Sequence, residues 1–184
     1  MAIKTFTTGE ILTASDTNTY LNNGGLVYVT GGTFSAVTEI LVDSVFTATY
    51  RNYYLLMDCQ SSAGSNIFTW QVRASGSTIS TTTYQQESHL LSGASNTSSS
   101  ATAQAFVRVG ANDVSGYHAL QMNIYCPAIA QPTRTISFFN RNSGTQAENI
   151  WASNTNATAY DGMRLSVASG NMTGTYALYG YRTA

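Results

Sequence analysis

The feature that most constrains the fold is a succession of short strand-like segments that starts at Leu26 and continues to Arg182. Several segments alternate apolar with polar residues, as half-buried strands do. Turns rich in Gly, Ser and Asn separate them, and no helical pattern lies between them. This succession predicts an all-β fold, an antiparallel β-sandwich of two packed sheets, for which we expect the jelly-roll form. The expected strands are 26–30, 37–46, 52–60, 68–74, 78–88, 104–109, 117–126, 133–140, 148–157, 163–168 and 174–182.

The first 25 residues differ from this pattern and contain the segment with helical character. Thr13 is a candidate N-cap, and Asp16 lies three residues further on, where negative charge favours the first turn of a helix. We expect a short helix from Ala14 to Leu21, ended by the Asn-Asn-Gly-Gly stretch that follows. Residues 1–25 are thus predicted to form an N-terminal attachment arm, and residues 26–184 a β-sandwich domain.

The apolar residues of this arm are too few to form a core of their own. An isolated helix of this length is only marginally stable in water. We therefore expect the arm to pack against the sandwich or, as we prefer, against a partner protein. The predicted partner-attachment residues are Phe6, Ile11, Leu12, Tyr20 and Leu21.

Composition excludes several classes of function. Charged residues make up 9% of the chain and the net charge is −1, whereas an average soluble domain is about 25% charged. The arginines are spread about one per segment, and a surface that follows phosphates needs clustered positive charge. No apolar run approaches the roughly 20 residues that span a membrane. We expect neither nucleic-acid binding nor membrane insertion.

No pattern of catalytic or metal-binding residues is present. His89 and His118 lie in unrelated segments, and the sequence has no nucleophile elbow, zinc-protease motif, phosphate-binding loop or calcium loop. Carboxylate pairs such as Glu39 with Asp43, or Glu148 with Asp161, can be named on number alone, and nothing marks either pair. We predict no enzymatic activity, no catalytic residue, no cofactor and no metal.

The remaining candidates have structural and functional interpretations. Cys59 and Cys126 are expected to be buried free thiols, with a disulfide between neighbouring strands as the alternative. Trp70 and Trp151 are expected in the core, and the stretch 92–103 as a flexible surface loop. The tyrosines are expected to pack in the core and across strands, but a subunit interface or a shallow sugar-binding surface is also open. The clustered tyrosines are Tyr50, Tyr53, Tyr54, Tyr176, Tyr179 and Tyr181.

The arm resembles a leader found at the start of many virion proteins of tailed bacteriophages, roughly F-T-A-G-E-V-L-T-A-A-D-x-N-x-Y-L. Two further segments resemble the β modules of such proteins, 45–53 (VFTATYRNY) and the closing strand 172–181 (MTGTYALYGY). Arg51 departs from the pattern, which often has an acid or amide there. The residues that match the leader are Phe6, Thr7, Gly9, Glu10, Leu12, Thr13, Ala14, Asp16, Asn18, Tyr20 and Leu21.

This resemblance implies a structural protein on the surface of a phage particle, without catalytic residues and assembled as a homotrimer. Our first expectation is a short tail-fibre or tail-tip protein, attached to other virion proteins through residues 1–25 and facing the host. A glycan of the host surface is then a candidate partner. The alternative is a capsid decoration (cement) or head-fibre protein that stabilises the shell because it binds only the assembled particle.

Overall fold

The computed structural model describes residues 7–11, 13, 25–64, 66–93, 95–112, 116–140 and 146–182. The predicted helix over 14–21 lies outside the described residues, as do Phe6, Leu12, Tyr20 and Leu21. In the described part of the arm, Thr7–Glu10 form a turn in which the Glu10 N–H donates to the Thr7 carbonyl at 3.0 Å. Gly9 takes the left-handed conformation (φ +88°) that the third position of a type II turn requires.

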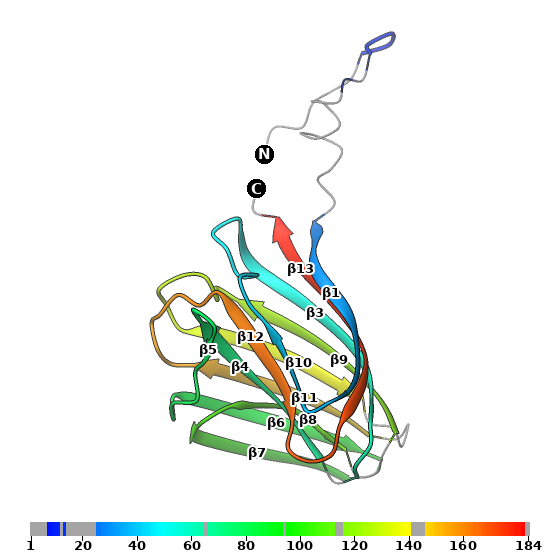
Figure 1. Ribbon diagram of the computed structural model, residues 1–184, viewed down its shortest axis with the longest axis vertical. Coiled ribbons are helices and arrows are strands. Elements are labelled where there is room, and N and C mark those ends of the chain that lie inside the picture. The colour runs from blue at the N-terminus through cyan, green and yellow to red at the C-terminus, as the bar shows by residue number, and fades with distance from the viewer. Residues whose placement is uncertain are drawn as a thin grey trace.

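The described residues form 13 strands in two antiparallel sheets (Figure 1). The large sheet has eight strands in the order β1 (Leu26–Val37), β13 (Met172–Arg182), β3 (Tyr50–Ser61), β9 (Gly116–Tyr125), β10 (Thr133–Asn140), β11 (Gln146–Asn154), β6 (Tyr84–Ser92) and β7 (Ser95–Gln104). The small sheet has five, in the order β2 (Glu39–Val42), β12 (Gly162–Val167), β4 (Asn66–Ala74) and β5 (Ser77–Thr78), with β8 (Val107–Asn112) also paired to β4.

The predicted antiparallel sandwich is therefore confirmed. The chain passes repeatedly from one sheet to the other, and the jelly-roll form stays a prediction because eight plus five strands exceed the eight of that fold. Among the described residues no helix is long and apolar enough to cross a membrane.

The loop predicted over 92–103 is wrong, because Ser95–Gln104 form β7, an edge strand of the large sheet. Its backbone pairs with β6 over most of its length. Side-chain hydrogen bonds add to this pairing. The Ser99 and Ser88 hydroxyl oxygens lie 2.8 Å apart, and the Ser98 hydroxyl oxygen lies 2.7 Å from His89 Nε2. An edge strand that is exposed on both faces needs few apolar residues, so its composition resembles that of a loop.

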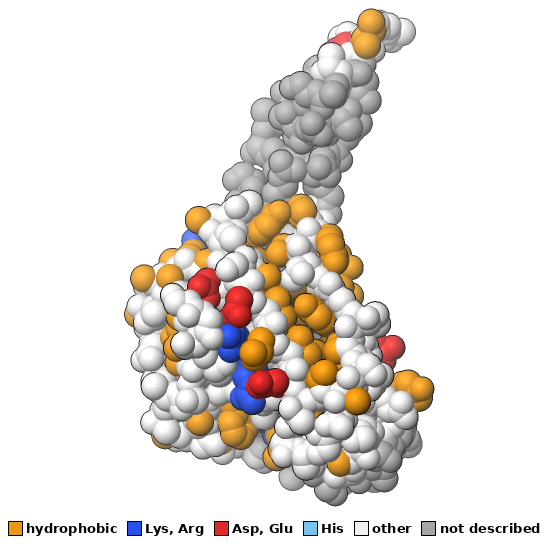
Figure 2. Space-filling model, viewed as in Figure 1, with side chains coloured by type: hydrophobic (Ala, Val, Ile, Leu, Met, Phe, Trp, Pro, Cys, Tyr) orange, Lys and Arg blue, Asp and Glu red, His pale blue; other side chains and the backbone are white. Residues whose placement is uncertain are grey.

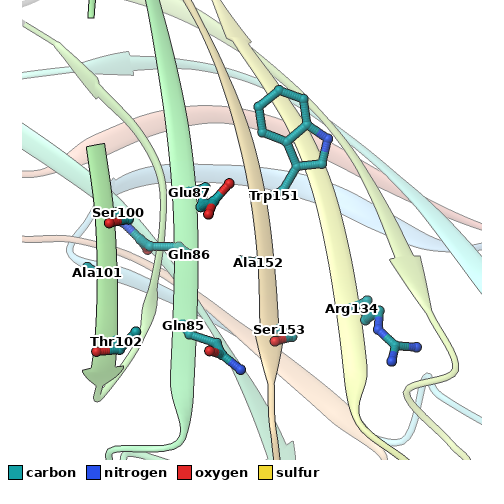
Figure 3. Close-up of a pocket in the computed structure, with 10 residues that line it drawn as sticks. All are labelled: Gln85, Gln86, Glu87, Ser100, Ala101, Thr102, Arg134, Trp151, Ala152 and Ser153. Carbon is teal, nitrogen blue, oxygen red and sulfur yellow. The ribbon is translucent and has the colours of Figure 1, made fainter. Parts of the chain in front are cut away.

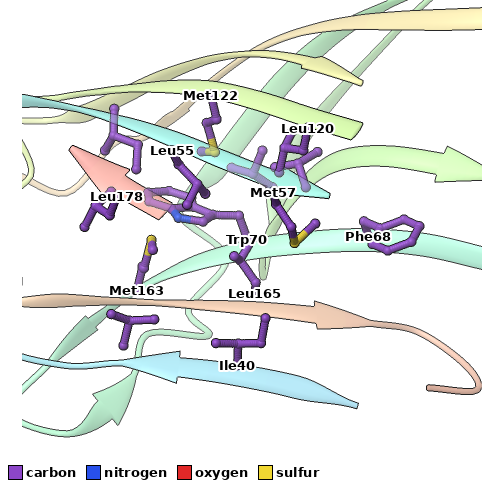
Figure 4. Close-up of a cluster of buried hydrophobic side chains, with 14 of the residues drawn as sticks. Ile40, Leu55, Met57, Phe68, Trp70, Leu120, Met122, Met163, Leu165 and Leu178 are labelled. Carbon is purple, nitrogen blue, oxygen red and sulfur yellow. The ribbon is translucent and has the colours of Figure 1, made fainter. Parts of the chain in front are cut away.

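The core lies between the two sheets and follows from strand alternation (Figure 4). On β3, Leu55 and Met57 point inward, whereas Leu56 and Asp58 point outward. Trp70 of β4 is fully buried, as predicted, and lies in the middle of this layer. Full burial of a leucine or methionine side chain such as Leu55 or Met57 contributes about 1.5–3 kcal/mol.

Both cysteines are free and buried, which confirms the thiol interpretation. Cys59 points into the core from β3, and burial, assisted by the nearby Asp58 charge, raises the pKa of its thiol to about 12. A thiol with this pKa stays protonated at neutral pH and acts as a small hydrophobic side chain.

Alternation in the last strand, β13, determines which of its tyrosines lie on the outer face of the large sheet. Gly180 points inward, and an added Cβ there would lie 2.3 Å from the Tyr50 ring. Tyr50 occupies this space and packs edge-on against Tyr53 with ring centroids 5.9 Å apart. The residues on either side of Gly180, Tyr179 and Tyr181, consequently point to the outer face of the large sheet.

Candidate binding face

Strand register arranges the outward residues of the large sheet in rows that cross the strands. One row, which we call the central row, carries aromatic residues at one end and Trp151 towards the other. Its members, in strand order from β1 to β7, are Tyr28, Tyr179, Tyr54, Asn123, Ile136, Trp151, Glu87 and Ser100.

Trp151 stands out on this face because the sequence predicts it to be buried, and that prediction is wrong. Its side chain is 45% exposed. Strand β11 turns Ile150 and Ala152 into the core, so the residue between them must point outward. The alternation of Ile150 and Ala152 is a signal in the sequence that could have identified Trp151 as a surface residue.

Trp151 borders a shallow hollow of about 330 Å³, which we call the Trp151 hollow (Figure 3). One edge of the region is fixed by His89, whose ring meets the indole edge-on at 6.2 Å and 80°. His89 in turn is hydrogen-bonded to Ser98 of β7 at 2.7 Å. The residues that line the hollow are Gln85, Gln86, Glu87, Ser100, Ala101, Thr102, Arg134, Trp151, Ala152 and Ser153.

Two charged side chains beside the indole have no side-chain partner among the residues that the structure describes. Glu87 lies opposite Trp151 on β6, and Arg134 lies on β10 in the next row, opposite Ser153. Both side chains are exposed, and within the described part of the chain neither makes an ion pair or a side-chain hydrogen bond. The carboxylate can accept and the guanidinium can donate hydrogen bonds to a bound molecule.

The other end of the central row is a tyrosine cluster. Tyr28 and Tyr179 meet edge-on with ring centroids 5.9 Å apart. The Tyr181 hydroxyl donates to Asn123 Oδ1 at 2.7 Å. Burial raises the pKa of Tyr181, and the nearby Tyr125 and Tyr54 raise it further. The phenol is therefore a neutral hydrogen-bond donor at neutral pH.

A second hollow of about 450 Å³ lies next to this cluster, and we call it the Leu56 hollow. It crosses β13, β3 and β9 on the same outer face. Exposed apolar side chains, Ile136 and Phe138 of β10, stand between the two hollows at 41% and 40% exposure. The outward residues that line the Leu56 hollow are Leu56, Asp58, Ala119, Gln121, Thr175 and Ala177.

The carboxylates that could be named as pairs all have structural roles. Glu39 pairs with Arg164 at 2.6 Å, and Asp43 pairs with Arg73 at 2.6 Å. The hydrogen bond from Arg73 is the main cause that lowers the pKa of Asp43. The two remaining acids do not meet as a catalytic pair either, since Glu148 is buried against Arg108 and Asp161 accepts from the Ser75 N–H at 3.0 Å.

The structure also separates the two histidines. His118 points inward from β9, buried between Phe68 and Phe139, and its ring stacks on Phe139 at 5.5 Å. His89 points outward from β6. Among the described residues no group of three or more His, Cys, Asp or Glu side chains could hold a metal ion.

Of the predicted attachment residues, the structure describes Ile11. Its side chain is 82% exposed, which is the highest value among the large exposed apolar residues of the described chain. The turn before it is exposed as well, and its Thr7 N–H donates to the Glu10 carboxylate at 3.1 Å. An apolar side chain presented in this way has surface available for a partner.

No family model matches the chain, and no curated protein sequence matches it. Solved structures similar to it include the galectin LEC-6 of Caenorhabditis elegans, at 8% identity and a TM-score of 0.38, with 85% of this chain and 96% of the galectin covered. A fructosyltransferase from A. japonicus is 11% identical with a TM-score of 0.39, and 92% of this chain and 28% of the fructosyltransferase are covered. The CBM2 module of an evolved Dit protein from Lactobacillus casei BL23 phage J-1 is 9% identical with a TM-score of 0.27, and 84% of this chain and 69% of the Dit chain are covered. At these scores the fold rests on the strand pairing of the chain itself.

Proposed function

We propose that this protein is a non-enzymatic structural component at the surface of a tailed-bacteriophage particle, where it binds a glycan of the host surface. Residues 1–25 attach it to other virion proteins, and the outer face of the large sheet is the binding face. The version of this proposal that we prefer is a short trimeric tail-fibre or tail-tip protein. Three copies on one particle would let several weak contacts add up through avidity.

The observation that carries the glycan part of this proposal is the Trp151 hollow. A pyranose ring has one face of C–H groups and a rim of hydroxyls. The exposed indole of Trp151 offers a flat apolar surface to the C–H face. Glu87 and Arg134, which have no side-chain partner in the described part of the chain, offer acceptors and donors to the hydroxyls. The hollow is shallow and open, as suits a sugar on a longer chain.

The attachment part is supported by the leader resemblance and by the exposure of Ile11. Five apolar side chains in a short arm need a surface to cover them, and a virion protein would supply it. Binding energy of this kind comes from the apolar area removed from water, at roughly 25 cal/mol per Å².

The binding experiment uses the full chain and polysaccharide extracted from host cell walls. We expect Trp151→Ala to weaken binding at least tenfold in calorimetry, because the flat apolar surface is removed. Leu41→Ala is the matched control, since Leu41 is 47% exposed on the opposite side of the sandwich. Equal binding by wild type and Trp151→Ala would rule out this hollow as the glycan site.

The attachment experiment changes the arm without removing it. Particles assembled with an Ile11→Asp, Leu12→Asp double variant are expected to contain at least tenfold less of this protein, whereas Leu41→Asp is incorporated normally. Normal incorporation of the double variant would refute attachment through these residues. Copy number in wild-type particles then separates a tail fibre, at a few tens or fewer, from a decoration protein, at hundreds.

A further inference from the structure

We infer that the glycan is an extended, uncharged polysaccharide that lies across the strands and occupies the Trp151 hollow and the Leu56 hollow together. This inference rests on the proposed function and adds the class of ligand and its direction. The alternative is a site for one terminal sugar, confined to Trp151.

The first argument is the position of the two hollows. Both open on the outer face of the large sheet, one over β10, β11, β6 and β7 and the other over β13, β3 and β9. Neighbouring strands lie about 4.8 Å apart, so the four spacings from β6 to β3 measure about 19 Å. This length exceeds any single sugar and suits a short stretch of a polymer.

The second argument is what lies between the hollows. Ile136 and Phe138 are exposed on β10. Phe138 is paired with Gln121 of the neighbouring strand β9, and Gln121 lines the Leu56 hollow. These side chains form an apolar floor with an amide group at its edge. A chain that leaves Trp151 in this direction stays in contact with apolar surface and hydrogen-bonding groups.

The third argument is charge. Glu87 and Arg134 line the Trp151 hollow, and Asp58 lines the Leu56 hollow. A polyanion would meet a carboxylate at each end of the path, and a polycation would meet Arg134. Like charges brought together in this way reduce affinity, so the arrangement favours a neutral chain.

The experiment measures the affinity of the full-length protein for neutral oligosaccharides of two to six sugars from the gluco-, galacto- and manno-series, with hyaluronan as the anionic probe. In the series that binds, we expect affinity to rise at least tenfold from two to six sugars, and hyaluronan to bind at least tenfold more weakly than the neutral hexasaccharide. Phe138→Ala and Gln121→Ala should each weaken the hexasaccharide at least threefold without changing the disaccharide. Tyr117→Ala is the control, because Tyr117 is 67% exposed on the same face beyond the path.

The outcomes separate the two proposals. Affinity that does not depend on length, together with loss of binding in Trp151→Ala, would overturn the extended path and leave the proposed glycan site standing. Preference for hyaluronan would overturn the neutral class. No binding to any oligosaccharide or to host polysaccharide would refute the proposed function itself, and the inference with it. If Phe138→Ala instead dissociates an oligomer in sedimentation, this face is covered by a second copy and the path is refuted.

Discussion

The two outer faces of the sandwich differ in the contacts of the charged side chains compared here. On the small sheet Arg73 binds Asp43, Thr78 and Gly76, and Arg164 binds Glu39 and Gln71. Figure 2 shows acidic and basic side chains side by side over this sheet. On the large sheet Glu87 and Arg134 make no such contacts within the described chain. Charged side chains that are hydrogen-bonded within the protein indicate a structural surface. Exposed charged side chains without such bonds, beside an exposed indole, indicate a surface that can bind a ligand.

The largest expected effect comes from exchanging one arginine on each face for alanine. Arg73 is 5% exposed, so Arg73→Ala removes a partly buried hydrogen-bonding network, and we expect the free energy of unfolding to fall by about 2 kcal/mol. Arg134→Ala should change the free energy of unfolding by less than about 0.5 kcal/mol, because Arg134 has no side-chain partner among the described residues. Urea denaturation of both variants measures the difference. A loss of similar size in Arg134→Ala would show that the large sheet's outer face is also structural.

A smaller effect is expected from the carboxylate partner of Arg73. The pKa of Asp43 is lowered in the folded protein, so its charge stabilises the fold above the unfolded pKa, near 3.9, and this contribution disappears as the pH falls through the folded pKa. Asp43→Asn should therefore lower the free energy of unfolding by about 1 kcal/mol at pH 7, since solvent screens a carboxylate that is 42% exposed.

The measurement is urea denaturation at several pH values between 7 and 2. The difference between wild type and Asp43→Asn should shrink below about pH 4 and vanish at lower pH. Glu87→Gln is the matched change on the other face, and we expect less than about 0.5 kcal/mol at every pH. A difference for Asp43→Asn that persists unchanged at pH 2 would mean that charge is not its cause.

The sequence places one of the two tryptophans correctly. Trp70 is expected in the core, and it is fully buried. The expectation for Trp151 is wrong because side-chain hydrophobicity predicts burial, whereas its place between the inward-facing Ile150 and Ala152 points it outward. Position in a strand decides which face a residue takes, whatever the residue is.

The candidate site was harder to predict because it depends on contacts between distant segments. Trp151 and Glu87 belong to strands that are far apart in sequence, and pairing of β11 with β6 brings them opposite each other. The edge strand β7 was missed for the same reason, since its stability comes from β6 and not from its own serines. Arg73, which forms the ion pair with Asp43, lies 30 residues further along the sequence. None of these pairings leaves a local signal in composition.

The smallest expected effect is spectroscopic and tests directly whether Trp151 is uncovered in solution. Trp70 is fully buried and Trp151 is 45% exposed, so acrylamide should quench the emission of the second much more than that of the first. Trp151→Phe is expected to remove most of the quenchable emission, and Trp70→Phe to leave it. A glycan that occupies the Trp151 hollow should protect this emission in wild type. If Trp151→Phe leaves quenching unchanged before any glycan is added, another surface already covers the indole, and a contact between copies of this chain would account for the apolar residues of the face.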